Sequence, residues 1–473
     1  MERRTAQESY VDLIDSGQFL AAEEIFSERR TDDPLEMVVR AEVANYFGKY
    51  DEAANLLDKV KGRATDIEVA SRFSLAQGRL ALSLNDAERA QTLLQGAYYF
   101  YTFKEDAFGA SQALLEIARL ERKTGQFEQA AEKLKIAEAK LAGRASKKAE
   151  YLKGLIISEQ AAVLAELGDL EAANKRYEEA STILKGVERG RHYAYTLVGI
   201  ADLKYALGEF QDSLEIYKEA NIVFERYDLK RDRAESQLKL ATALIRLKRF
   251  ERAERMAFDS REIQSNNPAG ESAALSVLSF VSLLQNEIED ALSYASKALE
   301  LADQSKSAVS RARARISLGH VKLASHDFRE AAQFLAEAAE IARQSSPSLI
   351  LKRAELEATI FLAEAYHNFD TRAGRAELTR AASILSGIED TWLGEEYDRV
   401  SAKYEEQIQF TDDNRLVFDG NQLPRWQEAK RTLEGFLLRN ALRQTNNSLT
   451  RAARKLGVSK VHVHNLKKKH HVE

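Results

Sequence analysis

The sequence predicts an all-α protein made of a long solenoid of helix pairs followed by a small helical domain. Three observations support this prediction. Residues that favour helices (Ala, Leu, Glu, Lys and Arg) dominate, and only four prolines occur in 473 residues. A short turn motif recurs along about four fifths of the chain. The last fifty residues reverse the charge of the rest and contain the pattern of two short helices joined by a tight turn.

The recurring motif has a turn residue, an aromatic or aliphatic residue two positions later, and a small residue three positions after that. Gly and Asn can adopt the left-handed backbone conformation that ends one helix. The small residue allows the second helix to approach the first closely. Nine copies begin at Gly17, Gly48, Asn85, Gly125, Gly168, Gly208, Lys248, Asn286 and His326, and their small residues are Ala22, Ala53, Ala90, Ala130, Ala173, Ser213, Ala253, Ala291 and Ala331.

Successive turn residues lie 31, 37, 40, 43, 40, 40, 38 and 40 residues apart. This pattern resembles the tetratricopeptide repeat (TPR), whose usual length is about 34 residues. The helices here are a few residues longer, as in the repeats of kinesin light chains and of bacterial regulators such as the maltose activator. The resemblance implies a TPR-like α–α superhelical solenoid of about ten units over residues 1–387, the tenth being a degenerate unit over residues 349–385. It also implies a groove that binds a protein or peptide.

Five aromatic residues cluster between positions 98 and 103, after the small residue Ala90. They cannot all face one stripe of a helix, so some rings must be exposed or must contact a neighbouring repeat. Packing between repeats is the ordinary explanation, and an aromatic groove for a peptide is the alternative. The candidates for partner binding are Tyr98, Tyr99 and Tyr101.

We expect a terminal helix and an acidic linker over residues 388–423, with the helix over about 387–404 and the linker over 405–424, where Asp, Asn and Gly favour turns. A third region, residues 424–473, begins with a helix over 424–444. Trp426, Leu433, Phe436 and Leu437 are spaced so that they share one face of that helix. The stripe is wider than one small domain needs, which is compatible with a homodimer through residues 424–444.

Residues 424–473 contain 12 Lys and Arg against 3 Asp and Glu, a charge of +9. Because the whole chain carries −5, residues 1–423 carry −14. Within the basic region, Ala453 and Gly457 have the spacing of a helix-turn-helix, in which a small residue lies where the helices cross and glycine makes the turn. Ala452, Leu456, Val458, Val463 and Leu466 are the expected packing residues, and Ser448 and Ser459 are the expected N-caps.

The segment LRNALRQTNNSLTRAARKLGVSK resembles the C-terminal DNA-binding segment of the Fis family. Thr445, Ala452 and Ala453 match that family, whereas Asn447-Ser448 replaces Gly-Asn and the Val463–Leu466 spacing is one residue shorter. The resemblance implies that the second helix enters the major groove of double-stranded DNA. The residues expected to face base edges are Ser459, Lys460, His462, His464 and Asn465, and those expected to contact phosphates are Arg451, Lys467, Lys468 and Lys469.

Several classes of protein are not expected. The chain has no cysteine and shows no apolar leader or membrane span, so a cytoplasmic protein without a membrane partner is expected. No phosphate-binding loop, His-Glu-x-x-His or Gly-x-Ser-x-Gly motif occurs, and the C-terminal histidines are poorly spaced for chelation, so neither an enzyme nor a cofactor or metal site is expected. The expected function is a bacterial DNA-binding transcription regulator, controlled by a partner in the solenoid. The alternative is an interaction scaffold that uses its basic tail for protein docking or autoinhibition.

Overall fold

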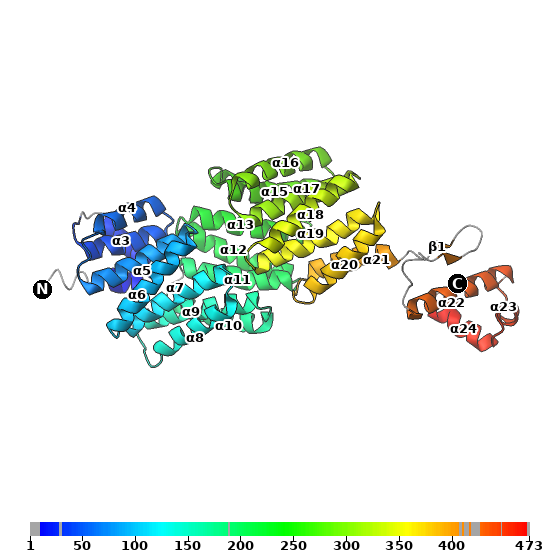
Figure 1. Ribbon diagram of the computed structural model, residues 1–473, viewed down its shortest axis with the longest axis horizontal. Helices are drawn as coiled ribbons and strands as arrows, with labels where there is room; N and C mark the ends of the chain where they lie inside the picture. Colours follow the sequence, from blue (N-terminus) through cyan, green and yellow to red (C-terminus); the bar gives the residue numbers. More distant parts are fainter. Residues whose placement is uncertain are drawn as a thin grey trace. The chain divides into compact units, whose positions relative to one another are not determined.

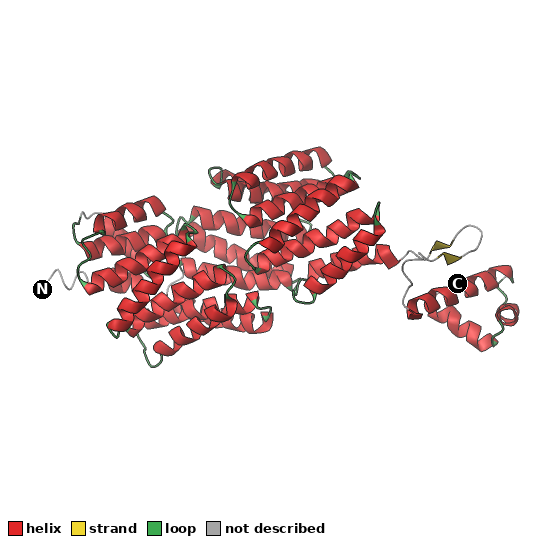
Figure 2. Ribbon diagram, viewed as in Figure 1, coloured by secondary structure: helices red, strands yellow, loops and turns green. Residues whose placement is uncertain are grey.

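The computed structural model is all-α, and it describes residues 10–27, 31–187, 190–405, 409–410, 416–417, 426–445 and 447–470. It divides into two compact units, Met1–Val400 and Ser401–Glu473. The first unit is a solenoid in which consecutive helices run antiparallel and stack on the preceding pair (Figures 1 and 2).

The solenoid begins with helical residues 10–15, which precede α2 (Phe19–Ser27). The helix pairs that follow in the described chain are α3 (Pro34–Tyr46) with α4 (Tyr50–Val60), α5 (Ile67–Ser83) with α6 (Ala87–Phe103), α7 (Ala107–Lys123) with α8 (Phe127–Lys140), α9 (Lys147–Glu166) with α10 (Leu170–Val187), α11 (Arg191–Ala206) with α12 (Phe210–Arg226), α13 (Lys230–Arg246) with α14 (Phe250–Ile263), α15 (Pro268–Leu284) with α16 (Ile288–Gln304), α17 (Ala308–Ala324) with α18 (Phe328–Gln344), and α19 (Leu349–His367) with α20 (Thr371–Leu385).

All nine predicted turn residues are confirmed, because each has a positive φ between the two helices of a pair. The glycines range from 75° at Gly48 to 88° at Gly168. The same conformation occurs at four residues with side chains: Asn85, Lys248, Asn286 and His326, with φ between 57° and 65°. A left-handed residue costs a side-chain-bearing amino acid about 1–2 kcal/mol, so the helix packing on both sides must hold these turns.

The small residues of the motif lie where the two helices of a pair touch, as predicted. Each of the nine has 0% of its surface exposed. A second small position occurs in the first helix, seven residues before the turn. At Gly319, in α17, an added Cβ would lie 2.5 Å from Cγ of Leu335 in α18. The close approach of the helices therefore depends on residues with little or no side chain.

The superhelix also contacts itself between units that are distant in sequence. Tyr151 of α9 lies against Gly17, where a Cβ would be 2.6 Å from the ring. Further along, Glu166 accepts a hydrogen bond of 2.5 Å from the backbone N–H of Leu349, and the guanidinium of Arg246 lies 3.6 Å from the centre of the Trp392 ring. These contacts join successive turns of the superhelix and fix its winding.

The helix predicted after the tenth pair is present as α21 (Thr391–Glu405). Most of the predicted linker lies outside the described residues. Its described part is one two-residue antiparallel pairing, β1 (Gln409–Phe410) with β2 (Leu416–Val417), which was not predicted.

The second unit contains α22 (Trp426–Gln444), α23 (Leu449–Leu456) and α24 (Lys460–Lys469), and we call these helices the three-helix unit. Its core is formed by side chains from all three helices: Leu438, Ala441, Leu442, Ala452, Ala453 and Val463, with Leu449, Leu456 and Leu466 packed against them. The predicted packing role of Val458 is wrong, since 36% of its surface is exposed. Val458 directly follows the turn, where the chain leaves the core.

The turn between α23 and α24 has the predicted form. Gly457 ends α23 with φ 66°, and its N–H and that of the next residue donate to the last carbonyls of the helix. Ser459 is the N-cap of α24, and its hydroxyl accepts a hydrogen bond of 3.1 Å from the N–H of His462. Ser448 occupies the N-cap position of α23 without a side-chain hydrogen bond.

Among the described residues, no helix is both long and apolar enough to cross a membrane. The same residues contain no group of three or more His, Cys, Asp or Glu side chains that could hold a metal ion.

Candidate functional site: a charged cavity in the solenoid and the surface of the three-helix unit

A cavity of about 630 Å³ lies inside the solenoid, and most of its lining comes from the first helices of successive pairs. Its lining follows the repeat. The position six residues before the turn supplies Glu42, Arg79, Arg119 and Asp202 from four of the repeats, and Ala162 from a fifth. The positions nine and thirteen residues before the turn supply further charged and aromatic side chains. Equivalent residues of consecutive repeats therefore face one space, although they lie about 40 residues apart in sequence.

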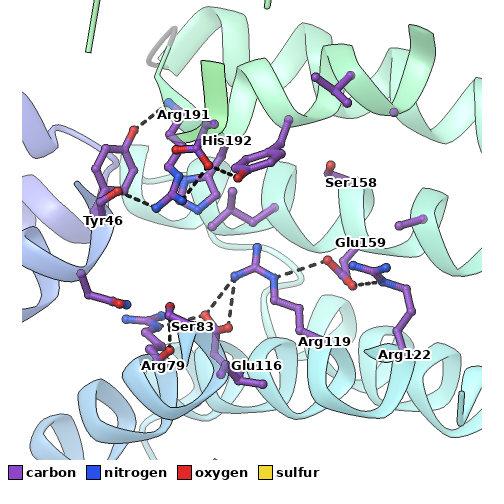
Figure 3. A pocket seen from close by; sticks show the side chains of 18 of the residues that line it. Tyr46, Arg79, Ser83, Glu116, Arg119, Arg122, Ser158, Glu159, Arg191 and His192 are labelled. Atoms are coloured by element: carbon purple, nitrogen blue, oxygen red, sulfur yellow. Dashed lines mark hydrogen bonds and ion pairs between the residues drawn. The ribbon is translucent and has the colours of Figure 1, made fainter. Parts of the chain in front are cut away.

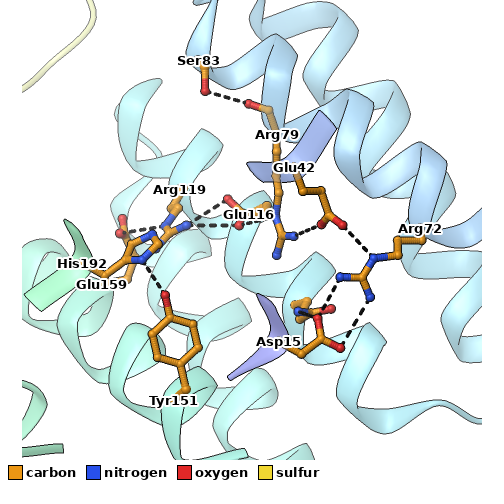
Figure 4. Close-up of polar contacts among 11 residues, drawn as sticks. Asp15, Glu42, Arg72, Arg79, Ser83, Glu116, Arg119, Tyr151, Glu159 and His192 are labelled. Carbon is orange, nitrogen blue, oxygen red and sulfur yellow. Dashed lines mark hydrogen bonds and ion pairs between the residues drawn. The ribbon is translucent and has the colours of Figure 1, made fainter. Parts of the chain in front are cut away.

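Charged side chains of alternating sign line one side of this cavity (Figures 3 and 4). We call them the ion-pair row, and its members in spatial order are Asp15, Arg72, Glu42, Arg79, Glu116, Arg119, Glu159 and Arg122. Neighbouring members are separated by 2.5–3.4 Å between nitrogen and oxygen. Three of the carboxylates, those of Glu42, Glu116 and Glu159, each pair with two arginines.

The carboxylates of the row are buried, and arginine neighbours favour the ionised form of two of them, Glu116 and Glu159. Only 6% of the Glu116 side chain is exposed. Burial alone would raise the pKa of Glu116, but Arg119 and Arg79 outweigh burial and lower it. Burial likewise opposes ionisation of Glu159, and Arg122 and Arg119 lower its pKa. Removing one partner from such a pair leaves an uncompensated buried charge, which is strongly destabilising.

Residues from α9, α11 and α3 form another part of the lining. The hydroxyl of Tyr151 lies 2.7 Å from Nδ1 of His192, and burial lowers the pKa of this histidine well below its usual value. Arg191 donates to the backbone oxygen of Tyr46 at 2.5 Å and to Asp232 at 2.9 Å (Figure 3). Tyr46 precedes Arg191 by 145 residues, so Arg191 both lines the cavity and joins two turns of the superhelix.

The cavity residues were not among the candidates that the sequence suggested. Their signal is present in the sequence, because charged residues recur at fixed distances before the turn residues: Glu42, Arg79 and Arg119 at one position, and Glu116 and Glu159 at another. On an isolated helix these charges are indistinguishable from a solvated face. Only the stacking of the repeats brings them together.

The three tyrosines suggested for partner binding are placed differently from one another. Tyr99 is exposed over 66% of its surface, Tyr98 is partly buried, and Tyr101 is buried with 6% exposed. Tyr101 packs against Gly109, where a Cβ would be 2.2 Å from its ring. Phe100 and Phe103 of the same helix are also exposed. None of the three tyrosines is among the residues that line the described cavity.

The three-helix unit exposes nearly all of the residues suggested for DNA contact. Ser459, Lys460, His462, His464 and Asn465 are all exposed along α24, while Val463 between them is fully buried. The remaining candidates, which were suggested for phosphate contact, comprise exposed Arg451, Lys468 and Lys469 and the partly buried Lys467. The ammonium of Lys469 pairs with Glu434 of α22 at 2.7 Å.

Comparison with known proteins identifies the architecture of the solenoid. No protein-family model matches the chain, and no curated protein matches it. Among solved structures, a Rap protein complexed with Competence and Sporulation Factor is similar over 77% of this chain and 100% of its own, with a TM-score of 0.57 and 14% identity. The apo form of RapI matches over 81% of this chain and 99% of its own, with a TM-score of 0.51 and 15% identity. The apo quorum sensor NprR from B. thuringiensis matches over 74% of this chain and 97% of its own, with a TM-score of 0.50 and 13% identity.

The chain has a TPR-like solenoid fold. At such low identity the likeness concerns the fold, and it does not extend to individual residues. Within this TPR-like solenoid the cavity lies along the first helices of the repeats, and its lining charges belong to this chain's own sequence.

Proposed function

We propose that this protein is a DNA-binding transcription regulator, whose TPR-like solenoid binds a partner peptide or protein that modulates a helix-turn-helix reader. Two parts of the molecule support the proposal: the polar surface of α24 and the cavity of the solenoid. The reader would be the three-helix unit, with α24 as the helix that enters the major groove.

The observation that carries the DNA-binding part is the division of α24 into a buried and an exposed face. Val463 is fully buried against α22 and α23, and Leu466 packs on the same core. The side chains on the other faces of α24 are polar, cationic or histidine, apart from Val461, and all of them are exposed except Lys467, which is partly buried. A helix anchored on one face with free polar side chains near its N-terminus is how helix-turn-helix proteins contact base edges.

We assign the contacts by side-chain chemistry. Asn465 has the amide that pairs with adenine, and Lys460 can donate to guanine. Arg451, Lys467 and Lys468 are cations suited to phosphates, which position the protein without specifying sequence. Lys469 would first have to leave Glu434, so we expect a smaller contribution from it.

The solenoid part of the proposal is supported by the cavity and by the comparisons. A Rap protein with a similar fold has been solved with Competence and Sporulation Factor bound, and NprR is a quorum sensor. A cavity of about 630 Å³ falls within the usual range for ligand sites. Because Arg191 lines the cavity and also holds Tyr46 of a distant repeat, a ligand that displaces Arg191 would alter the winding of the superhelix. Ligand binding in the cavity would in this way change the conformation of the solenoid.

A homodimer through residues 424–444 is part of the same proposal. Leu433 and Leu437 lie one helical turn apart on α22 and are 42% and 45% exposed, whereas Leu438 and Leu442 are used in the core of the unit. Two exposed leucines on one face are a suitable contact for a second copy. A dimer would read two half-sites.

The test separates sequence-specific from general electrostatic binding. Duplex DNA selected from a random pool by the purified protein should bind the full chain with an affinity that falls as salt is raised. For each neutralised phosphate, the logarithm of the binding constant should fall by about 0.9 for every tenfold increase in salt concentration. Asn465→Ala should relax the preference at one base position, and Lys468→Ala should weaken all sequences alike and reduce the salt slope. Lys230→Ala, which changes an exposed lysine of the solenoid, is the control, and it should leave the sequence preference and the salt slope unchanged. An interaction scaffold would show no sequence preference in any of these variants.

A further inference from the structure

The two ends of the ion-pair row differ. At one end, Asp15 contacts Arg72 and also accepts a hydrogen bond of 3.3 Å from Gln112. Each of the first three arginines of the row, Arg72, Arg79 and Arg119, pairs with two carboxylates. Arg122, at the other end, pairs through its Nε with Glu159 at 2.5 Å, and no second carboxylate of the described residues pairs with it. The alternation of charges therefore ends on a cation.

The next residue adds a second cation to this end. Lys123 also lines the cavity, and among the described residues no carboxylate lies within 4.0 Å of its ammonium, which donates instead to the backbone oxygen of Leu82 at 3.2 Å. Burial lowers the pKa of Lys123, and Arg122 lowers it further. Two adjacent cations thus share the wall with one carboxylate, that of Glu159.

Two neighbouring carboxylates, those of Asp202 and Glu166, are held by other partners. Asp202 lines the cavity but pairs with Lys239. Glu166 accepts its hydrogen bond from the backbone of Leu349 and does not approach Arg122 within 4.0 Å. About 26% of the Arg122 side chain remains accessible to solvent, and Arg122 is a lining residue of the cavity. A guanidinium with its Nε occupied still offers its terminal nitrogens to an acceptor.

We propose that the Arg122–Lys123 end of the cavity binds an anionic group of the solenoid's ligand, namely a carboxylate of a short peptide. The carboxylate would take the next place in the alternating row, paired with Arg122 as Glu159 is. The planar fork of arginine suits a carboxylate, and the charge-assisted hydrogen bonds are stronger where water is excluded. The inference rests on the proposed function, because it assumes that the cavity holds a peptide, and it adds the chemistry and the position of one contact.

The experiment uses the full-length chain and two pools of synthetic pentapeptides of random sequence, one with a free C-terminal carboxylate and one with a C-terminal carboxamide. Bound peptides are separated with the protein and identified by mass spectrometry. We expect retained peptides to carry a carboxylate. Arg122→Gln should reduce their retention about tenfold or more, because it removes a charge-assisted hydrogen bond to the carboxylate.

Two further variants keep the test independent of folding. Lys123→Met leaves all pairs of the ion-pair row in place, because Lys123 has no carboxylate partner in the described structure, and it should also reduce retention. Arg176→Gln removes an arginine that pairs with Glu179 on α10 and does not line the cavity, so it should change nothing.

The outcomes are distinct. Retention from the free-carboxylate pool alone supports a C-terminal carboxylate, and retention of amidated peptides rich in Asp or Glu supports a side-chain carboxylate. Equal retention of neutral amidated peptides, unaffected by Arg122→Gln and Lys123→Met, would overturn the inference while peptide binding stands. If neither pool is retained, both the inference and the peptide part of the proposed function fail.

Discussion

Replacing Glu116 by Gln removes one charge from the centre of the ion-pair row and leaves the shape of the side chain nearly unchanged. Glu116 accepts hydrogen bonds from Arg79 at 2.9 Å and from Arg119 at 3.1 Å, and its side chain is 6% exposed. The amide carries no negative charge, and its NH2 replaces the oxygen Oε2, which also accepts from Arg119. The two arginines then face each other without an intervening charge. Breaking a buried ion pair from one side costs about 3–5 kcal/mol, so we expect a loss of about 3 kcal/mol or more.

The assay is urea unfolding of the full chain, monitored by far-ultraviolet circular dichroism. With a slope of about 1–3 kcal/mol per molar urea, the transition of the solenoid should move down by about 1 M or more. Glu300→Gln is the matched control, since Glu300 pairs with Lys297 at 2.7 Å on an exposed helix face where the pair is worth at most about 1 kcal/mol. Equal and small effects of the two substitutions would show that water screens the row, and the reasoning about the cavity would be refuted.

Three other substitutions test separate parts of the account by thermal or chemical unfolding. Gly457→Ala should destabilise the three-helix unit by about 1 kcal/mol, because φ at Gly457 is 66°, although no atom lies within 4 Å of the added methyl group. The control is Gly186→Ala, which lies in a helix, is equally open and should be neutral or stabilising. Similar effects at both sites would contradict the assigned turn. Gly319→Ala should cost about 1–3 kcal/mol through the contact with Leu335, and an unchanged midpoint would mean that the helices separate freely. Burial raises the pKa of Glu357 to about 7, so ionisation of this carboxyl costs stability as the pH rises towards and through 7. Glu357→Gln should therefore stabilise the solenoid by on the order of 3 kcal/mol at pH 8 and have little effect at pH 4.5. Equal effects at the two pH values would count against a buried neutral carboxyl.

The repeat architecture follows closely from the sequence, because it depends on residues whose conformational role is local. A glycine or asparagine that ends a helix and a small residue five positions later need no distant partner to be recognised. The spacing of the repeat also predicts the turn residues Lys248 and His326, although neither is glycine or asparagine. The turn at Gly457 and the cap at Ser459 follow from the same kind of local chemistry.

The cavity could not be located in this way, because its members come from helices that only the superhelix brings together. Asp15 and Arg72 are 57 residues apart, and Tyr46 and Arg191 are 145 apart. The aromatic run was the more visible feature in the sequence, yet Tyr101 is buried and packs against Gly109 of the next helix pair. Val458 has the hydrophobicity of a core residue, but the turn directs the chain away from the core at that position.

Selection of fragments from random duplex DNA by the purified full-length protein tests the central claim most directly. The account predicts that a short motif is enriched, that Asn465→Ala loses the preference at one of its positions, and that binding weakens steeply as salt is raised. Two results would contradict the assignment of α24 as the reading helix. One is that no motif is enriched. The other is that a motif is enriched but neither Asn465→Ala nor Lys460→Ala changes it.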